Sequence, residues 1–307
     1  APKLCPRPAA RFTTSSVAPG CSSSGSVRTQ GALTMTDALT DPDDGLQVLH
    51  VTDPHLASDP QSRLGGIDTR ASWEAVLGAA LAEGPVPDLV LLTGDIVHDG
   101  AAATYHRVCA DLLAIGAPAL LLPGNHDDNT VMAAAVPGHG PVAWAGHQRI
   151  GGWLIVALDS TVAGAPGGHL AEGELARLQG LLQDLPELPT LIMLHHQPVA
   201  VGSAWLDRIG AGNGDRLMAL VDAHPQVRVV LWGHVHQAFD RRHGRARLLA
   251  TPSTCIQFAP EQDRFGLDPK PPGWRRLTLH PDGRVDTRVE RLARLPEGLD
   301  LGLGGYR

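Results

Sequence analysis

The amino-acid sequence predicts an α/β fold, and two patterns between residues 46 and 240 support this expectation. Short runs of consecutive apolar residues alternate with longer segments whose apolar residues recur at helical spacing. Continuous apolar runs are typical of strands that are buried on both faces of a sheet. Because strands and helices alternate, we expect a largely parallel sheet whose strands present their carboxyl ends at one edge.

Six apolar runs define the predicted strands, at residues 46–51, 88–92, 119–123, 152–159, 190–194 and 227–232. Four amphipathic segments define the predicted helices, at residues 68–83, 105–116, 175–185 and 216–224. Asp68 or Ser72 is expected to cap the first helix. The apolar faces of the first two helices include Leu81 and Leu113, and we expect both side chains in the core.

The last third of the chain adds a different pattern. Residues 274–280 and 284–292 flank the turn at 281–283, which contains Asp282 and Gly283. Two such runs around a short turn predict a β-hairpin. We therefore expect an antiparallel addition to the sheet.

Composition and charge limit the partners of the protein. The 307-residue chain has a formal net charge of −7 and no stripe of Lys and Arg, which argues against nucleic acid as the main partner. No apolar run is long enough for a membrane-spanning helix, so no membrane partner is expected. The four cysteines form neither a CxxC pair nor a disulfide framework, which favours a reducing, cytoplasmic location.

Three segments differ in composition. Residues 1–44 are rich in Ser, Pro and Gly, and we expect a disordered leader there. This leader could be translated upstream of a start at Met35, and an organelle-import segment is the alternative. Residues 45–295 form one predicted globular domain, and residues 296–307 form a C-terminal tail.

Polar side chains follow five of the predicted strands. On an extended backbone residues i and i+2 point to the same face, so Asp53 and His55 are expected to project together. The same spacing pairs His234 with His236. Taken singly, a D-x-H or G-H-x-H motif is more typical of a structural role such as a polar turn. Together they indicate one site, whose candidate donors are Asp53, His55, Asp95, Asn125, His195, His234 and His236.

This donor set favours a pair of metal ions. Seven nitrogen and oxygen donors are too many for one catalytic zinc ion, which keeps about three protein ligands. Two divalent ions that share a carboxylate fit better, and Asp95, central and unpaired, is the natural bridge. The donor types suit iron or manganese, with zinc or cobalt as alternatives. His126 could protonate a leaving oxygen or bind a phosphate oxygen, and Asp127 could orient His126 or face solvent.

The motifs D-x-H, G-D, G-N-H-D, H-H-x-P and G-H-x-H occur in an order that resembles the calcineurin-like metallophosphoesterases over about residues 46–240. The resemblance implies a sandwich of two mixed β-sheets flanked by helices, with a dimetal site at the carboxyl ends of the strands. It implies that His126 contacts the scissile phosphate and that His196 lies behind the ligands. The implied ligands are Asp53, His55 and His236 for one ion, Asn125, His195 and His234 for the other, and Asp95 for both. The implied substrate-binding residues are His55, Asp95, Asn125, His126 and His236.

Three later segments, 202–207, 247–258 and 272–283, are similar to bacterial class III 3′,5′-cyclic-AMP phosphodiesterases. This similarity implies hydrolysis of cAMP to 5′-AMP by attack of a metal-bridging hydroxide. Gln197 departs from that family, which has a histidine there, but the position is not a ligand position. Thr254, Gln257 and Phe258 could line a base pocket, with Phe258 stacking on adenine, or could pack the sheet edge. Cys255 is expected to pack.

Two alternatives to this function stay open. The protein could be a broader phosphodiesterase that acts on glycerophosphodiesters or 2′,3′-cyclic nucleotides. It could also be a non-catalytic, metal-bearing binding protein. The partner expected for a cyclic-AMP phosphodiesterase is its substrate, cAMP. The protein could act as a monomer or a homodimer.

Overall fold

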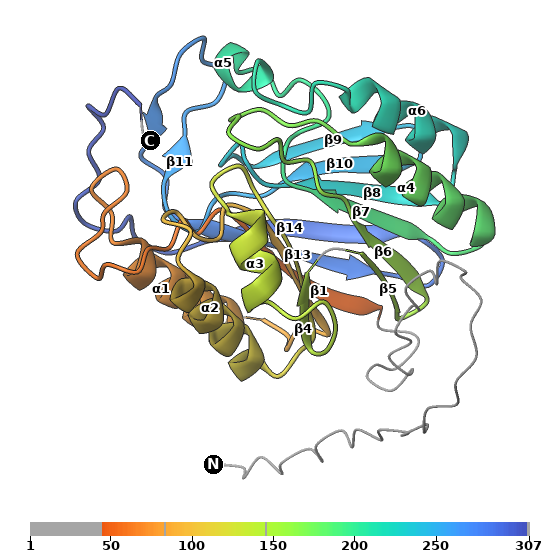
Figure 1. Cartoon of the computed structure of the whole chain (residues 1–307), viewed down its shortest axis with the longest axis horizontal. Helices are drawn as coiled ribbons and strands as arrows, with labels where there is room; N and C mark the ends of the chain where they lie inside the picture. The colour runs from red at the N-terminus through yellow and green to blue at the C-terminus, as the bar shows by residue number, and fades with distance from the viewer. Residues whose placement is uncertain (1–44, 83, 145, 306–307) are drawn as a thin grey trace, which may run out of the picture. The chain divides into compact units, whose positions relative to one another are not determined.

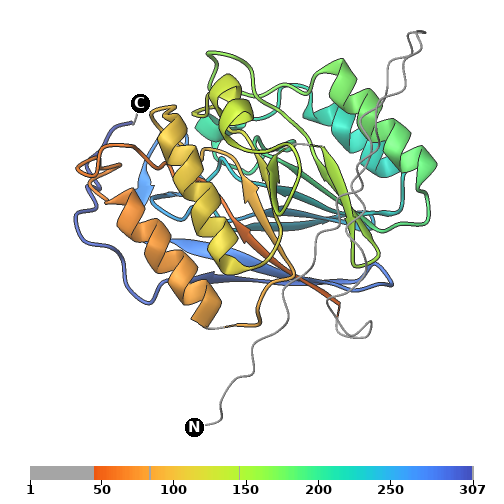
Figure 2. The same ribbon diagram turned by 60° about the horizontal axis from the view of Figure 1, so that its bottom comes forward.

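Two six-stranded β-sheets lie face to face, and helices cover their outer faces (Figures 1 and 2). The computed structural model describes residues 45–82, 84–144 and 146–305. The predicted leader and the last two residues of the predicted tail lie outside these ranges. The two-sheet sandwich that the family resemblance implied is confirmed.

The first sheet has the strand order β14-β13-β1-β2-β3-β4. Strands β1 to β4 are parallel, and β13 pairs antiparallel with both β1 and β14. The predicted hairpin in the last third is therefore confirmed. The strands are β1 (Leu46–Val51), β2 (Leu89–Thr93), β3 (Ala119–Leu122), β4 (Val142–Trp144), β13 (Gly273–Leu279) and β14 (Val285–Arg291).

The second sheet has the strand order β5-β6-β7-β8-β10-β9, with a parallel centre and antiparallel edges. Its strands are β5 (His147–Ile150), β6 (Trp153–Ala157), β7 (Thr190–Leu194), β8 (Val227–Trp232), β9 (Phe239–His243) and β10 (Ala246–Ala250). A small third sheet pairs β11 (Gln257–Phe258) with β12 (Leu267–Asp268). The expected parallel pairing is present at the centre of both sheets. Its division between two sheets did not follow from the apolar pattern, because this pattern identifies a strand but not the sheet that it joins.

Helices pack on the outer face of each sheet (Figure 2). The first sheet is covered by α1 (Thr69–Ala82), α2 (Ala102–Ile115) and α3 (Asn129–Ala135), and the second by α4 (Glu172–Asp184) and α6 (Gly214–Ala223). The short α5 (Ala204–Asp207) follows β7. Within the described ranges, no helix has the length and apolar character needed to cross a membrane.

Two side chains that were expected in the core are exposed. Leu81 is 38% exposed and Leu113 is 51% exposed. Each lies one position past a buried residue, which is about 100° around the helix, and only one stripe of each helix faces the sheet. At the start of α1, Asp68 accepts a hydrogen bond from the backbone N–H of Ala71 at 2.9 Å, so Asp68 rather than Ser72 provides the cap.

Three apolar layers hold this arrangement together. Along β1, Leu49 and Val51 face the helices, whereas Leu46 and Val48 face the second sheet. Because side chains alternate along a strand, His50 shares the inward face of Val48. The core between the sheets therefore becomes polar toward the carboxyl ends of its strands.

Candidate metal centre

The carboxyl ends of strands from both sheets meet in one region. Strands β1, β2 and β3 of the first sheet and β7 and β8 of the second run into the segments that carry the seven predicted donors. The structure brings all seven together, and all but the half-buried Asn125 are buried. Buried carboxylates and imidazoles are rare unless they are paired or bind a metal.

Most of the donors lie on left-handed backbone. Positive φ values of 46–62° occur at Asp53, His55, Asp95, His234 and His236. Among the described non-glycine residues, only Glu261 shares this conformation. Each such residue costs about 1–3 kcal/mol and is typical of functional sites. The predicted pairs do project together, but the extended backbone that was expected to cause this is absent, because the strands end before the donors begin.

Gly94 allows three of these loops to meet. A Cβ atom at Gly94 would lie 2.6 Å from Nδ1 of His195 and 2.7 Å from the backbone nitrogen of Gly124. Both distances are too short for a side chain. Glycine at position 94 therefore permits a close approach of these loops beside Asp95.

Asp53, His55 and His236 form one compact group of donor atoms. Nε2 of His236 lies 3.3 Å from Nε2 of His55 and 3.5 Å from Oδ1 of Asp53. Nδ1 of His236 donates to the carbonyl oxygen of Ile256 at 2.8 Å, so Nε2 of the neutral ring carries a lone pair. A lone pair that faces a carboxylate oxygen leaves a place that suits a cation.

Asp95, Asn125 and His195 form a second convergent set. Nδ1 of His195 donates to the carbonyl oxygen of Thr93 at 2.7 Å, which leaves Nε2 as the ring nitrogen that faces the other donors. That nitrogen lies 3.3 Å from Oδ2 of Asp95 and 3.2 Å from Oδ1 of Asn125. Oδ2 of Asp95 also lies 3.6 Å from Nε2 of His55, so this carboxylate faces both groups.

His234 completes the second set and brings an unexpected neighbour. Its Nε2 atom is buried and has no hydrogen-bond partner within the described ranges. His195, His196 and His234 lie close enough to offer nitrogen atoms to one ion. Although they are adjacent in the sequence, His195 and His196 have their rings 4.8 Å apart, edge to face. His196 is held by a 2.9 Å contact between its Nδ1 and Oγ of Ser160.

The protonation states fit a site for a positive charge. Burial lowers the pKa of His234 and of His55 well below the usual value, so both rings are neutral donors at neutral pH. Burial also opposes the charged form of Asp95, but His195, His126 and His55 outweigh it and hold the pKa of Asp95 well below its usual value. Burial opposes the charged form of His195, but Asp95 and Asp53 outweigh it and raise the pKa of His195 to about 9, so this ring carries a proton at neutral pH that a bound metal ion would displace. The residues therefore fit a pair of divalent cations.

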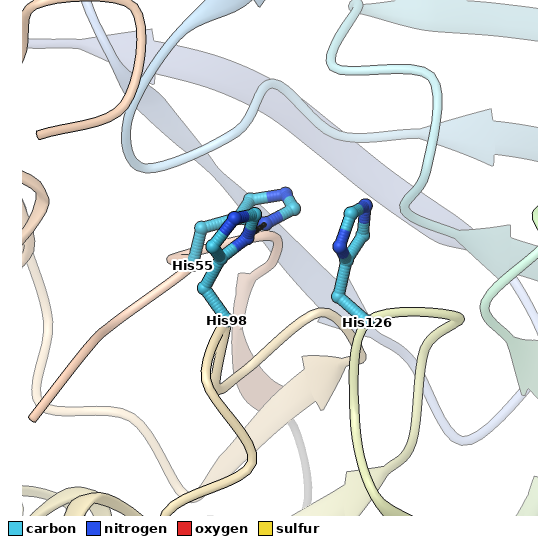
Figure 3. Close-up of side chains that lie close together, drawn as sticks. All are labelled: His55, His98 and His126. Carbon is cyan, nitrogen blue, oxygen red and sulfur yellow. Dashed lines mark hydrogen bonds between the residues drawn. The ribbon is translucent and has the colours of Figure 1, made fainter. Parts of the chain in front are cut away.

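A histidine that sequence reasoning missed lies beside the predicted donors. Figure 3 shows His55, His98 and His126, which come from the loops after β1, β2 and β3. Nδ1 of His98 lies 3.4 Å from Nδ1 of His55, and its ring stacks on His126 with centroids 5.0 Å apart. The only sequence signal was its place three residues after Asp95, in the same loop.

Asp127 has a structural role in this region. Its carboxylate accepts hydrogen bonds from the backbone N–H groups of Ile96, Val97 and Gly124 and from the hydroxyl of Tyr105. It therefore joins the loop that carries Asp95 to the loop that carries His126. Burial and the nearby Asp95 raise the pKa of Asp127 to about 6.

The predicted adenine platform is not available in this structure. Phe258 is 2% exposed, and its ring stacks on His236 with centroids 4.1 Å apart. The face of the ring thus supports a predicted metal ligand, and the alternative of packing is the one the structure shows. Cys255 is buried, as expected.

The sequence and this geometry identify the class of protein. The chain belongs to the calcineurin-like phosphoesterase family, whose family model matches residues 46–238. A solved structure titled as a dimetal phosphatase from Danio rerio has the same fold, with a TM-score of 0.53, 15% identity and coverage of 81% of this chain and 99% of that chain.

Curated relatives within the family are much more similar. The chain is 39% identical over 264 residues to the 3′,5′-cyclic adenosine monophosphate phosphodiesterase CpdA of Pseudomonas aeruginosa, covering 86% of this chain and 96% of the relative. It is 40% identical over 262 residues to the enzyme of the same name from Escherichia coli (strain K12), covering 85% and 95%.

Proposed function

We propose that this protein is a dimetal phosphodiesterase that hydrolyses 3′,5′-cyclic AMP to 5′-AMP. The observation that carries this proposal is the convergence of seven nitrogen and oxygen donors from five strand ends around Asp95. The names of relatives at 39–40% identity support the substrate.

The two groups of donors support the proposed ligand sets. Asp53, His55 and His236 would hold one ion, Asn125, His195 and His234 would hold the other, and Asp95 would contribute to both. The 3.6 Å and 3.3 Å distances from Asp95 to imidazole nitrogens on either side support this bridging role. Iron or manganese suits a mixed oxygen and nitrogen set without thiolate, with zinc and cobalt as alternatives. Two such ions, when bound, supply Lewis-acid activation of the phosphoryl group and of the attacking water.

His126 is the proposed catalytic residue of the chain itself. Its backbone N–H donates to Oδ1 of Asp95 at 2.9 Å, and its ring is half-buried beside His98 and His55. Burial lowers the pKa of His126, so the substrate-free ring is neutral at neutral pH. A neutral imidazole donates a hydrogen bond more readily than a full proton. We therefore assign His126 to a phosphate oxygen next to the leaving 3′ oxygen.

The broader phosphodiesterase stays a second candidate because of Phe258. This ring, which was expected to stack on adenine, is buried against His236. No other described residue has been assigned to the base. Specificity for cAMP therefore needs a direct test.

Metal-reconstituted turnover tests the function. The purified chain is stripped of metal and supplied with Mn²⁺ or Fe²⁺, and hydrolysis of 3′,5′-cAMP, 2′,3′-cAMP and bis-p-nitrophenyl phosphate is followed in parallel. Metal-dependent release of 5′-AMP, with a kcat/KM well above that for the other two diesters, supports the proposal. Preference for either of the others keeps the chemistry and replaces the substrate. Metal binding without hydrolysis would favour the binding-protein alternative.

A cytoplasmic location is part of the same proposal. Cys109 and Cys255 are both buried as free thiols. Unpaired thiols agree with a reducing compartment.

A further inference from the structure

A continuous chain of buried hydrogen bonds lies beneath the proposed metal centre. It starts at Thr251, just after β10 in the second sheet, and passes through His50 in β1 of the first sheet. It continues through Thr93 and Thr52 to Oδ2 of Asp53. All five side chains are 0% exposed. None of the first four is a predicted ligand.

The carboxylate of Asp53 fixes which residue donates each of these hydrogen bonds. Thr52 has one hydroxyl proton and donates it to Oδ2 of Asp53 at 2.7 Å, because an ionised carboxylate only accepts. The 2.8 Å contact between the hydroxyls of Thr93 and Thr52 must then be donated by Thr93. Thr93 in turn accepts from Nε2 of His50 at 2.8 Å.

The tautomer of His50 follows from these hydrogen bonds. Because Nε2 donates, Nδ1 of the neutral ring accepts the hydroxyl proton of Thr251 at 2.6 Å. Full burial, together with Arg275 opposite His50 on β13, lowers the pKa of His50 well below its usual value and keeps the ring neutral. Every donor in the chain points toward Asp53, and aligned hydrogen bonds of this kind strengthen one another.

These hydrogen bonds also distinguish the two oxygens of Asp53. Oδ2 accepts from Thr52, whereas Oδ1 lies 3.5 Å from Nε2 of His236, inside the first group of donors. Both oxygens also accept from the backbone N–H of His234, at 3.0 and 3.1 Å. Gly233 makes room for this arrangement, since a Cβ there would lie 2.1 Å from Oγ1 of Thr52 and 2.7 Å from Oδ2 of Asp53. The backbone of Thr93 reaches the second group as well, because its carbonyl oxygen accepts from Nδ1 of His195.

We propose that His50 is a positioning residue of the metal centre, which acts through Thr93 and Thr52 to orient Asp53 and hold its Oδ1 toward the metal ion. This inference rests on the proposed function, since it takes Asp53 as a ligand. Partners that hydrogen-bond to metal ligands change metal affinity by about 10- to 100-fold when they are removed. His50 would produce such an effect without contacting a ligand directly.

The test measures metal affinity rather than turnover. The metal-free protein is titrated with Mn²⁺ by isothermal titration calorimetry, and thermal unfolding is recorded for each variant. We expect His50→Leu and Thr52→Val to weaken one of the two Mn²⁺ sites by about 10- to 100-fold. His50→Gln should restore most of the affinity, because its amide N–H can still donate to Thr93. The matched control is Val48→Ala, which leaves a cavity in the same core but keeps every hydrogen bond between Thr251 and Asp53. It should lower Tm and leave the Mn²⁺ affinity unchanged.

The outcomes separate this proposal from the function that it rests on. Unchanged Mn²⁺ affinity in a folded His50→Leu variant and in Thr52→Val would overturn the positioning role alone. An equal loss of affinity in Val48→Ala would also overturn it, because the loss would then follow from packing. If His50→Leu does not fold, the near-isosteric Thr52→Val decides the question. If the unmodified chain takes up no Mn²⁺, both the metal centre and the positioning role fail.

Discussion

The two ends of the core between the sheets differ in what holds them together. Where the strands begin, Leu46, Val48 and Leu89 pack against the second sheet through apolar contacts alone. Where the same strands end, His50 and Thr93 are equally buried but are held by hydrogen bonds. Apolar contacts tolerate small changes in shape, whereas a buried polar group that loses its partner costs about 1–3 kcal/mol.

This difference teaches how one fold serves stability and chemistry at once. Apolar burial at one end stabilises the fold. This stabilisation offsets the cost of the buried carboxylates and imidazoles at the other end, which lie on left-handed backbone. We therefore expect mutations at the two ends to be separable. Changes at the polar end should affect metal binding and turnover, and changes at the apolar end should affect unfolding.

Asp95→Ala should have the largest effect, since Asp95 faces both groups of donors. Removing the shared carboxylate should abolish binding of both ions and lower turnover by about 10³-fold or more, because the Lewis acids are worth several kcal/mol. Inductively coupled plasma analysis of bound metal, together with cAMP turnover, checks this. Retention of two ions by the variant would remove Asp95 from the bridging position.

His126→Ala should separate chemistry from metal binding. The side chain is not one of the seven proposed ligands, so both ions should remain bound. Loss of a hydrogen-bond donor to a phosphate oxygen should lower kcat by about 10²- to 10³-fold with little change in KM. His98→Gln serves as a comparison, since it removes the ring that stacks on His126 but leaves His126 itself. An unchanged kcat for His126→Ala would exclude it from the mechanism.

Leu89→Ala probes the apolar end in the neighbouring strand. Leu89 is fully buried in the core between the sheets and pairs with Val48 of β1. Its truncation should lower the free energy of unfolding by about 2–5 kcal/mol and leave Mn²⁺ affinity and kcat unchanged. Urea unfolding and calorimetric titration measure the two quantities. A parallel loss of metal affinity would show that the two ends are not separable.

Glu290→Gln should have the smallest effect, because it removes only partly exposed ion pairs, and such pairs contribute little to stability. Burial opposes the charged form of Glu290, but Arg288, Trp274 and Arg276 hold its pKa below the usual 4.5. Since the folded pKa is the lower one, the stability that it contributes is present above pH 4.5 and is lost as the pH falls through the folded pKa. We expect the variant to lose about 1 kcal/mol at pH 7 and less at pH 3 in urea unfolding. Equal losses at both pH values would contradict this assignment.

The sequence alone determined the strands and the donors that follow them. Five apolar runs end in Asp, Asn or His, and this pattern is local, so it could be recognised without any knowledge of packing. The conformation that presents those donors could not be predicted in the same way. The left-handed φ values of Asp53 and His55 persist because the surrounding loops pack against them, and no residue preference indicates them.

Only the tertiary structure decided which residues support the donors. Strands β4 and β5 are neighbours in the sequence but join different sheets, and this division places Thr251 of one sheet against His50 of the other. Tertiary packing also stacks the ring of His98 on His126. It stacks Phe258 on His236, so this ring does not face a substrate. Contacts between residues far apart in the chain depend on how the sheets stack, and that stacking is a property of the whole core rather than of any one segment.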